Sequence, residues 1–201
     1  MRDAKLIKAL KLEWIHELRG KTVVCIASGP SLSVEDCEMV RASGLPTIVT
    51  NTTYQRCPWA TVLVGHDDGW WLEHYRQVAA TFKGRKIACQ SNGRRWGAQS
   101  LKMLMFKSFR NSGAAAISLA AFAGAERAIL LGFDCQKTGG QTHWHGDHPT
   151  TLGNAGTMPK WAERIEGAGV YARSKGCEVV NATRETALTC FRRVNLEEAL
   201  A

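Results

Sequence analysis

Short apolar runs that each end in small or polar residues recur along this chain, and this repetition limits its fold more than any other feature. The first run, residues 22–27, is continuous, which is typical of a strand buried on both faces of a sheet. Six strands are expected, at 22–27, 47–50, 60–64, 85–89, 128–131 and 178–180. Helical patterns occur at 3–19, from 33 onward, and at about 70–82, 112–124 and 159–175. This alternation predicts an α/β fold of Rossmann-like type, a mostly parallel sheet of about six strands with helices on both faces.

The chain is expected to form one domain. Its 201 residues contain no repeat, low-complexity tract or linker, so we expect a single nucleotide-binding-like domain over 1–201, with an N-terminal helix at 3–19 and a core at about 21–190. No run approaches the roughly 18–20 apolar residues of a membrane span, and the charged start does not resemble a signal peptide. We therefore expect a cytoplasmic protein with no membrane partner. The seven cysteines contain no C-x-x-C pair, which favours reduced core thiols.

The ends of the predicted strands indicate where a ligand would bind. In an open parallel sheet, ligands lie outside the carboxyl ends of the strands. The residues that follow the strands here are Ser28, Gly29, Ser31, Asn51, His66, Asp67, Asn92, Asp134 and Asn181. Each alone is an ordinary turn residue, whereas the whole set on one sheet edge predicts a binding site.

The turn Ser28-Gly29-Pro30-Ser31 directly follows the first strand. Glycine lets a backbone approach a ligand closely, and the N–H groups at the start of the next helix can bind phosphate. The turn is neither G-x-G-x-x-G nor a P-loop, so it fits a phosphate cradle and an ordinary strand-to-helix turn equally well. A capping box of Ser33 and Asp36 is expected to open the helix.

A second polar turn, Asn111-Ser112-Gly113, opens an alanine-rich stretch. Ser112 is placed either to cap that helix or to donate to an anion at its N-terminus, and capping is the favoured role from sequence alone. The helix leads to the fifth predicted strand, which ends near Asp134.

These turns, in this order, resemble the bacterial sialyltransferase family of glycosyltransferases. The matching residues are Ser28-Gly29-Pro30-Ser31-Leu32, Asn51, Asn111-Ser112-Gly113 and Ile129-Leu130-Leu131-Gly132-Phe133-Asp134. The same order is similar to the related DUF115 proteins, which include archaeal 6-hydroxymethylpterin diphosphokinase-like enzymes, and to small phage proteins. The resemblance covers about residues 21–190.

The resemblance implies roles for several of these residues. The Gly29-Pro30-Ser31 turn would line the nucleotide phosphate site, and Asn51 would bind the nucleotide's phosphate or sugar. Ser112-Gly113 would contact phosphate from the helix N-terminus, and one histidine after Asp134 would match the sialyltransferase general base. The chain departs from the family at Ser28, where sialyltransferases usually have asparagine, and it lacks a clear tyrosine pair for the departing phosphate.

Residues 142–148 contain an H-x-H-x-D-H pattern. This is the metal-ligand motif of metallo-β-lactamases, and it could hold zinc or another transition metal. No histidine follows His148 and the preceding strands alternate with helices, which argues against that family. Three roles stay open for His143, His145 and His148. They are a general base on a lid preceded by a mobile loop at 137–140, metal binding in another geometry, and no chemistry on a solvated loop.

The acidic pair Asp67-Asp68 follows the third predicted strand and precedes Trp70 and Trp71. Two carboxylates here could ligate Mg²⁺ that bridges phosphates. They could equally cap the helix that begins near Gly69, a role that we favour for Asp68. Adjacent tryptophans face different sides of a helix, so at most one is expected in the core and the other could stack on a base.

Three functions are consistent with these features. The first is a nucleotide-dependent transferase, specifically a glycosyltransferase with a nucleotide-sugar donor and a histidine general base. The second is Mg²⁺-dependent diphosphate transfer from ATP to a hydroxyl, with Asp67, Asp68 or Asp134 holding the metal. The third is a non-catalytic nucleotide- or nucleic-acid-binding module, with which the net charge of +8 agrees. A nucleic acid as the acceptor would combine the first and third.

Overall fold

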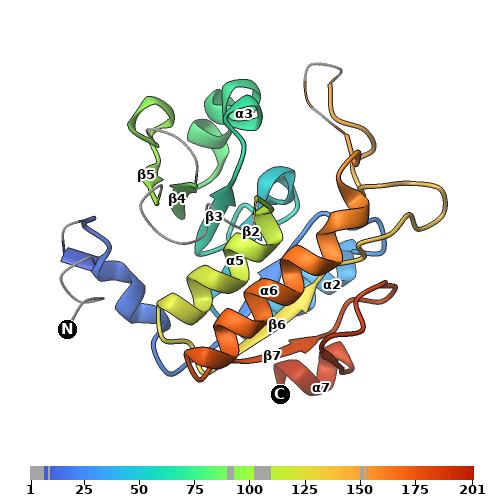
Figure 1. Cartoon of the computed structure of the whole chain (residues 1–201). Coiled ribbons are helices and arrows are strands. Elements are labelled where there is room, and N and C mark those ends of the chain that lie inside the picture. The colour runs from blue at the N-terminus through green and yellow to red at the C-terminus, as the bar shows by residue number, and fades with distance from the viewer. Residues whose placement is uncertain (1–6, 9, 90–92, 102–109, 150–151, 153) are drawn as a thin grey trace.

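The computed structural model describes residues 7–8, 10–89, 93–101, 110–149, 152 and 154–201. The described residues form eight strands in one sheet, and every neighbouring pair is parallel, in the order β5-β4-β3-β2-β1-β6-β7-β8 (Figure 1). The strands are β1 Thr22–Ile26, β2 Thr47–Thr50, β3 Val62–Gly65, β4 Arg85–Ala88, β5 Gln99–Ser100, β6 Arg127–Leu131, β7 Glu178–Asn181 and β8 Arg192–Arg193. The α/β, Rossmann-like fold is confirmed, with eight strands where about six were expected.

The two additional strands, β5 and β8, contain two residues each and lie at the two ends of the sheet. Their residues are polar or charged, so no apolar run predicts them. An edge strand has one neighbour and needs no buried faces, and charged side chains there discourage pairing with another chain.

Helices cover both faces of the sheet (Figure 1). The α-helices are α2 Val34–Ser43, α3 Asp68–Thr81, α5 Ser112–Phe122, α6 Trp161–Ser174 and α7 Leu196–Leu200, and the 3-10 helices are η1 Glu13–Leu18, η2 Asn51–Gln55, η3 Gly93–Trp96 and η4 Met158–Lys160. Alternate side chains of β1 enter two different cores. Val23 and Cys25 pack with η1, α5 and α6, whereas Val24 and Ile26 pack with α2 and α3. The continuous apolar run at 22–27 is thus buried on both faces.

The order of the strands reverses at β1. This strand pairs with β2 on one side and with β6 on the other, so that Val24 lies opposite both Thr47 and Ile129. The chain builds the sheet outward from β1 to β5 and then crosses over to β6. Ligands of doubly wound sheets bind outside the carboxyl ends of the strands at such a reversal. A ligand site is therefore expected at the segments that follow β1 and β6.

Of the three helix starts predicted from capping residues, the one at Ser33 is correct. Ser33 Oγ accepts a hydrogen bond from the N–H of Asp36, and the Asp36 carboxylate accepts one from the N–H of Ser33, both at 3.1 Å, so the capping box is confirmed. The expectation that Asp68 caps α3 is wrong. Asp67 occupies the N-cap position, and its side chain makes no capping hydrogen bond.

The expectation of a single N-terminal helix at 3–19 is also wrong for the described residues. Lys11 has a φ of 54°, in the left-handed region, and the short 3-10 helix η1 begins after it. Trp14 and Leu18 nevertheless pack in the core. The expected helical stretch thus contributes side chains to the core, but its described residues do not form one continuous helix.

Both tryptophans of α3 are buried, which corrects the expectation of one. Trp70 is 3% exposed and Trp71 is fully buried. Trp70 Nε1 donates to Thr52 Oγ1 and Trp71 Nε1 donates to the Gly65 carbonyl oxygen, each at 3.1 Å. Consecutive residues differ by about 100° around a helix, so a wide apolar stripe can include both. Neither indole is free to stack on a ligand.

All seven cysteines are free thiols, and five of them are buried. Burial raises the pKa of Cys89 and of Cys135 to about 12, so both thiols are protonated at neutral pH. None of the described helices is long and apolar enough to cross a membrane.

Candidate functional site

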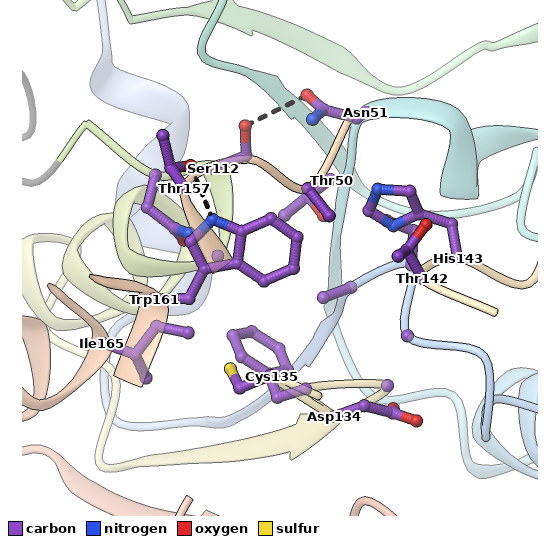
Figure 2. Close-up of a pocket in the computed structure, with 18 of the residues that line it drawn as sticks. Thr50, Asn51, Ser112, Asp134, Cys135, Thr142, His143, Thr157, Trp161 and Ile165 are labelled. Carbon is purple, nitrogen blue, oxygen red and sulfur yellow. Dashed lines mark hydrogen bonds between the residues drawn. The ribbon is translucent and has the colours of Figure 1, made fainter. Parts of the chain in front are cut away.

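A pocket of about 180 Å³ lies at the carboxyl edge of the sheet, where the strand order reverses (Figure 2). Most of the predicted site residues line it: Ser28, Gly29, Asn51, Asp67, Ser112, Gly113, Asp134, His143 and His148. Other predicted residues are outside its lining: Pro30, Ser31, His66, Asp68, His145 and Asn181. Asn92 lies outside the described residues. The carboxyl ends of β1, β2, β3 and β6 thus contribute to one site.

Asp134 holds the turn that follows β1. Its buried carboxylate accepts hydrogen bonds from the N–H and the Oγ of Ser31, both at 2.9 Å, and from Thr138 Oγ1 at 3.0 Å. Burial raises the pKa of Asp134, and the hydrogen bonds from Ser31 and Thr138 oppose that rise. A carboxylate with three donors already bound is a structural acceptor, with little capacity left for a metal ion.

Position 29 requires glycine because its backbone lies very close to the Asp134 carboxylate. A Cβ at this position would overlap Oδ1 of Asp134 and lie 2.5 Å from the Gly132 carbonyl oxygen. The N–H of Gly29 donates to that carbonyl at 2.8 Å, the N–H of Ser31 donates to Asp134, and Pro30 has no N–H. The N–H groups of Gly29 and Ser31 are therefore engaged with protein atoms, and Pro30 offers none.

The start of α5 offers donors to the pocket instead. Asn111 is the N-cap residue, and its Oδ1 accepts from the N–H of Ala114 at 2.9 Å, so the expectation that Ser112 caps the helix is wrong. In the described part of the chain no hydrogen bond engages the backbone N–H of Ser112 or Gly113, and both residues line the pocket. Ser112 Oγ donates to Asn51 Oδ1 at 3.1 Å, which joins this helix end to the end of β2 (Figure 2).

The three histidines of residues 142–148 pack against one another. The His143 and His145 rings are stacked with centroids 5.1 Å apart, and the His148 ring lies 5.2 Å from the first and 4.8 Å from the second. His143 Nδ1 lies 3.2 Å from Ser28 Oγ, and the N–H of Trp144 donates to the Ser28 carbonyl oxygen at 3.1 Å. These contacts fasten the histidine segment to the turn after β1.

The histidines are uncharged at neutral pH. Burial, with a smaller contribution from neighbouring histidines, lowers the pKa of His143 to about 4 and that of His145 to about 3. Burial also lowers the pKa of His148, while the carboxylates of Asp147 and Asp67 act in the opposite direction. An uncharged imidazole can accept a proton, and His148 has carboxylates beside it to stabilise the imidazolium that results.

The predicted metal ligands do not assemble. Among the residues that the structure describes, no group of three or more His, Cys, Asp or Glu side chains is arranged to hold a metal ion. Asp67 lines the pocket with its side chain 68% exposed, whereas Asp68 lies in the first turn of α3 and outside the pocket lining. The structure therefore brings one carboxylate of the acidic pair to the site.

Trp161 and Arg110 are among the pocket residues that were not predicted from the sequence. The Trp161 Nε1 donates to Thr157 Oγ1 at 2.9 Å, and its ring stacks near that of His143 with centroids 5.9 Å apart (Figure 2). The exposed Arg110 directly precedes Asn111, the N-cap residue of α5. An aromatic residue in the first turn of a helix, after a long polar loop, is the weak sequence signal that could have indicated Trp161.

No protein-family model and no curated protein matches this chain. The resemblance to the sialyltransferase and DUF115 superfamily stays a prediction that rests on the residues quoted for it. The geometry of the pocket is the basis for inferring function.

Proposed function

We propose that this protein is a nucleotide-dependent transferase that moves a glycosyl group from a nucleotide sugar to an acceptor hydroxyl. One observation carries the proposal. A helix N-terminus with open N–H groups, at Ser112 and Gly113, shares a pocket with the uncharged imidazoles of His143 and His148. Figure 2 shows Ser112 and His143 at this pocket. A site that binds an anion at one end and accepts a proton at the other has the parts that such a transfer needs.

The nucleotide phosphates would lie against the start of α5. Helix N-termini carry partial positive charge and unpaired N–H groups, which stabilise bound phosphate. Asn51 uses its Oδ1 to accept from Ser112, so its amide Nδ2 can donate to a phosphate or a ribose hydroxyl. The exposed guanidinium of Arg110 adds positive charge at the same end of the pocket.

The indole of Trp161 supplies an apolar surface for the sugar or the base of the donor. Aromatic side chains commonly line small-molecule pockets, while a few polar groups fix the orientation of the ligand. The hydrogen bond from Trp161 to Thr157 holds the ring in place before any ligand binds.

The proposed reaction is a direct displacement at the anomeric carbon. The acceptor oxygen forms a bond to that carbon while the bond from the carbon to the donor phosphate breaks. His148 takes the proton of the acceptor hydroxyl, and the leaving phosphate keeps the electron pair. The N–H groups of Ser112 and Gly113 stabilise the charge on the leaving phosphate.

Diphosphate transfer from ATP has less support in the geometry. That reaction uses Mg²⁺ held by oxygen ligands. The Asp134 carboxylate is engaged by Ser31 and Thr138, and Asp68 lies outside the pocket lining, which leaves Asp67 as the one predicted carboxylate available there.

A thermal-shift screen tests the proposal. The protein is heated with CMP, UDP, GDP, ADP, ATP and their sugar conjugates, with and without Mg²⁺. A ligand at 100 times its Kd stabilises the folded state by about 2.7 kcal/mol and so raises Tm. We expect one nucleotide and its sugar conjugate to raise Tm without metal. If none of these ligands raises Tm, the proposal is contradicted.

Product analysis separates the alternatives. Release of a nucleoside mono- or diphosphate from a sugar nucleotide, without metal, supports glycosyl transfer. Release of AMP that strictly requires Mg²⁺ supports diphosphate transfer instead. A non-catalytic module predicts that replacing His143, His145 and His148 leaves both ligand affinity and biological activity unchanged.

A further inference from the structure

The positive charge of this chain is concentrated in one segment. Residues 74–125 contain nine of the 26 Lys and Arg residues and no Asp or Glu, whereas all 18 acidic residues lie in the rest of the chain. Outside this segment the charges nearly balance, with 17 basic and 18 acidic residues. The net charge of +8 is therefore a property of one region and not of the whole surface.

The fold places much of this acid-free segment at one end of the sheet. The segment includes most of α3, all of β4, η3 and β5, and the whole of α5. In Figure 1, α3, β4 and β5 lie together at the end opposite β7 and α7. The described cations around α3, β4 and η3 are Arg76, Lys83, Arg85, Lys86, Arg94 and Arg95, and all except the half-buried Lys86 are exposed.

These cations are not neutralised within the described part of the chain. None of its salt bridges involves Arg76, Arg94 or Arg95, whereas the half-buried Arg127 and the exposed Arg192 both bond to Glu178. An unbalanced set of surface cations attracts polyanions and costs self-repulsion, so it points to an anionic partner.

Aromatic rings order the guanidinium groups on this surface. The Tyr75 and Trp96 rings contact each other with centroids 5.4 Å apart. The Arg95 guanidinium lies 4.7 Å from the Trp96 ring centre, and that of Arg76 lies 5.7 Å from the Tyr75 ring centre. Arg76 Nε also donates to the Tyr75 hydroxyl at 3.0 Å. Contacts of this kind hold a guanidinium group in place while its remaining N–H donors can bind phosphate.

We propose that this basic edge, formed by Arg76, Lys83, Arg85, Arg94 and Arg95 around the Tyr75–Trp96 contact, binds a nucleic acid strand that is the acceptor of the transferase. Tyr75 is about 10 Å along α3 from Asp68, next to the pocket-lining Asp67, so a strand on this edge reaches the histidine end of the pocket. The acceptor assignment rests on the proposed function, whereas the binding surface does not.

Fluorescence anisotropy tests the surface. The probes are a fluorescein-labelled 20-nucleotide single strand and the duplex of the same sequence, titrated with protein at several salt concentrations. The variant R76A/R94A/R95A should bind at least tenfold more weakly than the wild type. The slope of its plot of log affinity against log salt concentration should be shallower by about 2 for the single strand. Each lost phosphate contact reduces the magnitude of that slope by about 0.7.

A matched control removes equal charge elsewhere. The variant R41A/R173A/K175A also loses three exposed cations, all outside residues 74–125, and should bind within about twofold of the wild type. An equal loss of oligonucleotide affinity in the two variants, or the absence of wild-type binding at low salt, contradicts the proposed binding surface. Equally tight binding of polyglutamate of matched length overturns nucleic acid as the partner. A Tm within 2 °C of wild type for both variants ensures that folding is not the cause.

Mass spectrometry of the oligonucleotide tests the acceptor role. With the donor that the thermal-shift screen identifies, the wild type should add the mass of one glycosyl residue. R76A/R94A/R95A should lose that product while it still binds the donor. Donor cleavage with an unmodified oligonucleotide overturns the acceptor assignment alone. If the protein binds the oligonucleotide but no nucleotide raises its Tm, the proposed function is contradicted, whereas the proposed binding surface is still supported.

Discussion

The carboxylate of Asp134 binds Ser31 through two hydrogen bonds, one from its backbone N–H and one from its Oγ, both 2.9 Å long. These bonds join the segment after β6 to the turn after β1, across the reversal in strand order. The same contact engages the N–H group that a phosphate cradle at this turn would use. The proposed phosphate site therefore lies at the start of α5, where the N–H groups of Ser112 and Gly113 line the pocket.

We predict that Gly29→Ala strongly destabilises the protein. The added methyl would overlap the Asp134 carboxylate and press on the Gly132 carbonyl, both of which are part of the rigid contact between β1 and β6. The free energy of unfolding should fall by about 2–4 kcal/mol. Urea unfolding measures it. Gly156→Ala is the control, since the nearest atom to its Cβ lies at 3.4 Å, and a comparable loss there would contradict the steric explanation.

Asn51→Asp should weaken nucleotide binding without unfolding the protein. Asn51 has a φ of 46°, a conformation that Asp also tolerates, and a carboxylate can still accept from Ser112 Oγ. The added negative charge faces the proposed phosphate site, so Kd for the nucleotide should rise at least tenfold. Calorimetric titration of the nucleotide and of the matching nucleoside measures this. An equal loss for the nucleoside, which has no phosphate, would place the phosphate elsewhere.

His148→Ala should reduce kcat about 100-fold or more, because general-base catalysis contributes about 10²–10⁴-fold. Donor affinity should change by less than threefold, since the donor phosphates are proposed to lie at α5. Steady-state kinetics with the identified donor measure both parameters. The variant Leu72→Ala, at an exposed position of α3, is a control that should leave kcat unchanged. Full activity of His148→Ala would remove this residue from the mechanism.

The ion pair of Asp36 and Arg184 should make stability depend on pH. Burial raises the pKa of Asp36, but hydrogen bonds from Arg184 at 2.6 and 2.9 Å and from the Ser33 N–H outweigh it, and the pKa is lowered. Because the folded-state pKa is below the unfolded value, this contribution is present above the unfolded pKa of about 3.9 and is lost as pH falls through the folded-state pKa.

Arg184→Ala should therefore lower the free energy of unfolding by about 1 kcal/mol near pH 7, a modest figure because the arginine side chain is 56% exposed. The difference from wild type should shrink as the pH is lowered below about 4. Urea unfolding across this range measures it. Arg41→Ala, which removes an exposed pair with Glu38, should have little effect at any pH, and a pH-independent loss in Arg184→Ala would contradict the ionic explanation.

Much of the candidate site was predictable because it lies at strand ends. Once the apolar runs at 22–27 and 128–131 are recognised as parallel strands, the residues after them must share one edge of the sheet. Ser28, Gly29, Asn51 and Asp134 were placed correctly at the pocket on that basis. Trp161 was not placed at the pocket, because it is the first residue of a helix and not at a strand end. The spacing of nearby residues does not show where the loop before that helix runs relative to the sheet.

The sequence by itself determined the alternation of strands and helices, the polar edge and the acid-free segment. These follow from which residue types occur in which order, and burial of apolar runs needs no knowledge of distant partners. Only the tertiary structure decided that the Asp134 carboxylate accepts hydrogen bonds from Ser31, that the His143 and His145 rings stack, and that the first N–H groups of α5 face the pocket. Ser31 and Asp134 are 103 residues apart, and their contact exists because β6 pairs with β1.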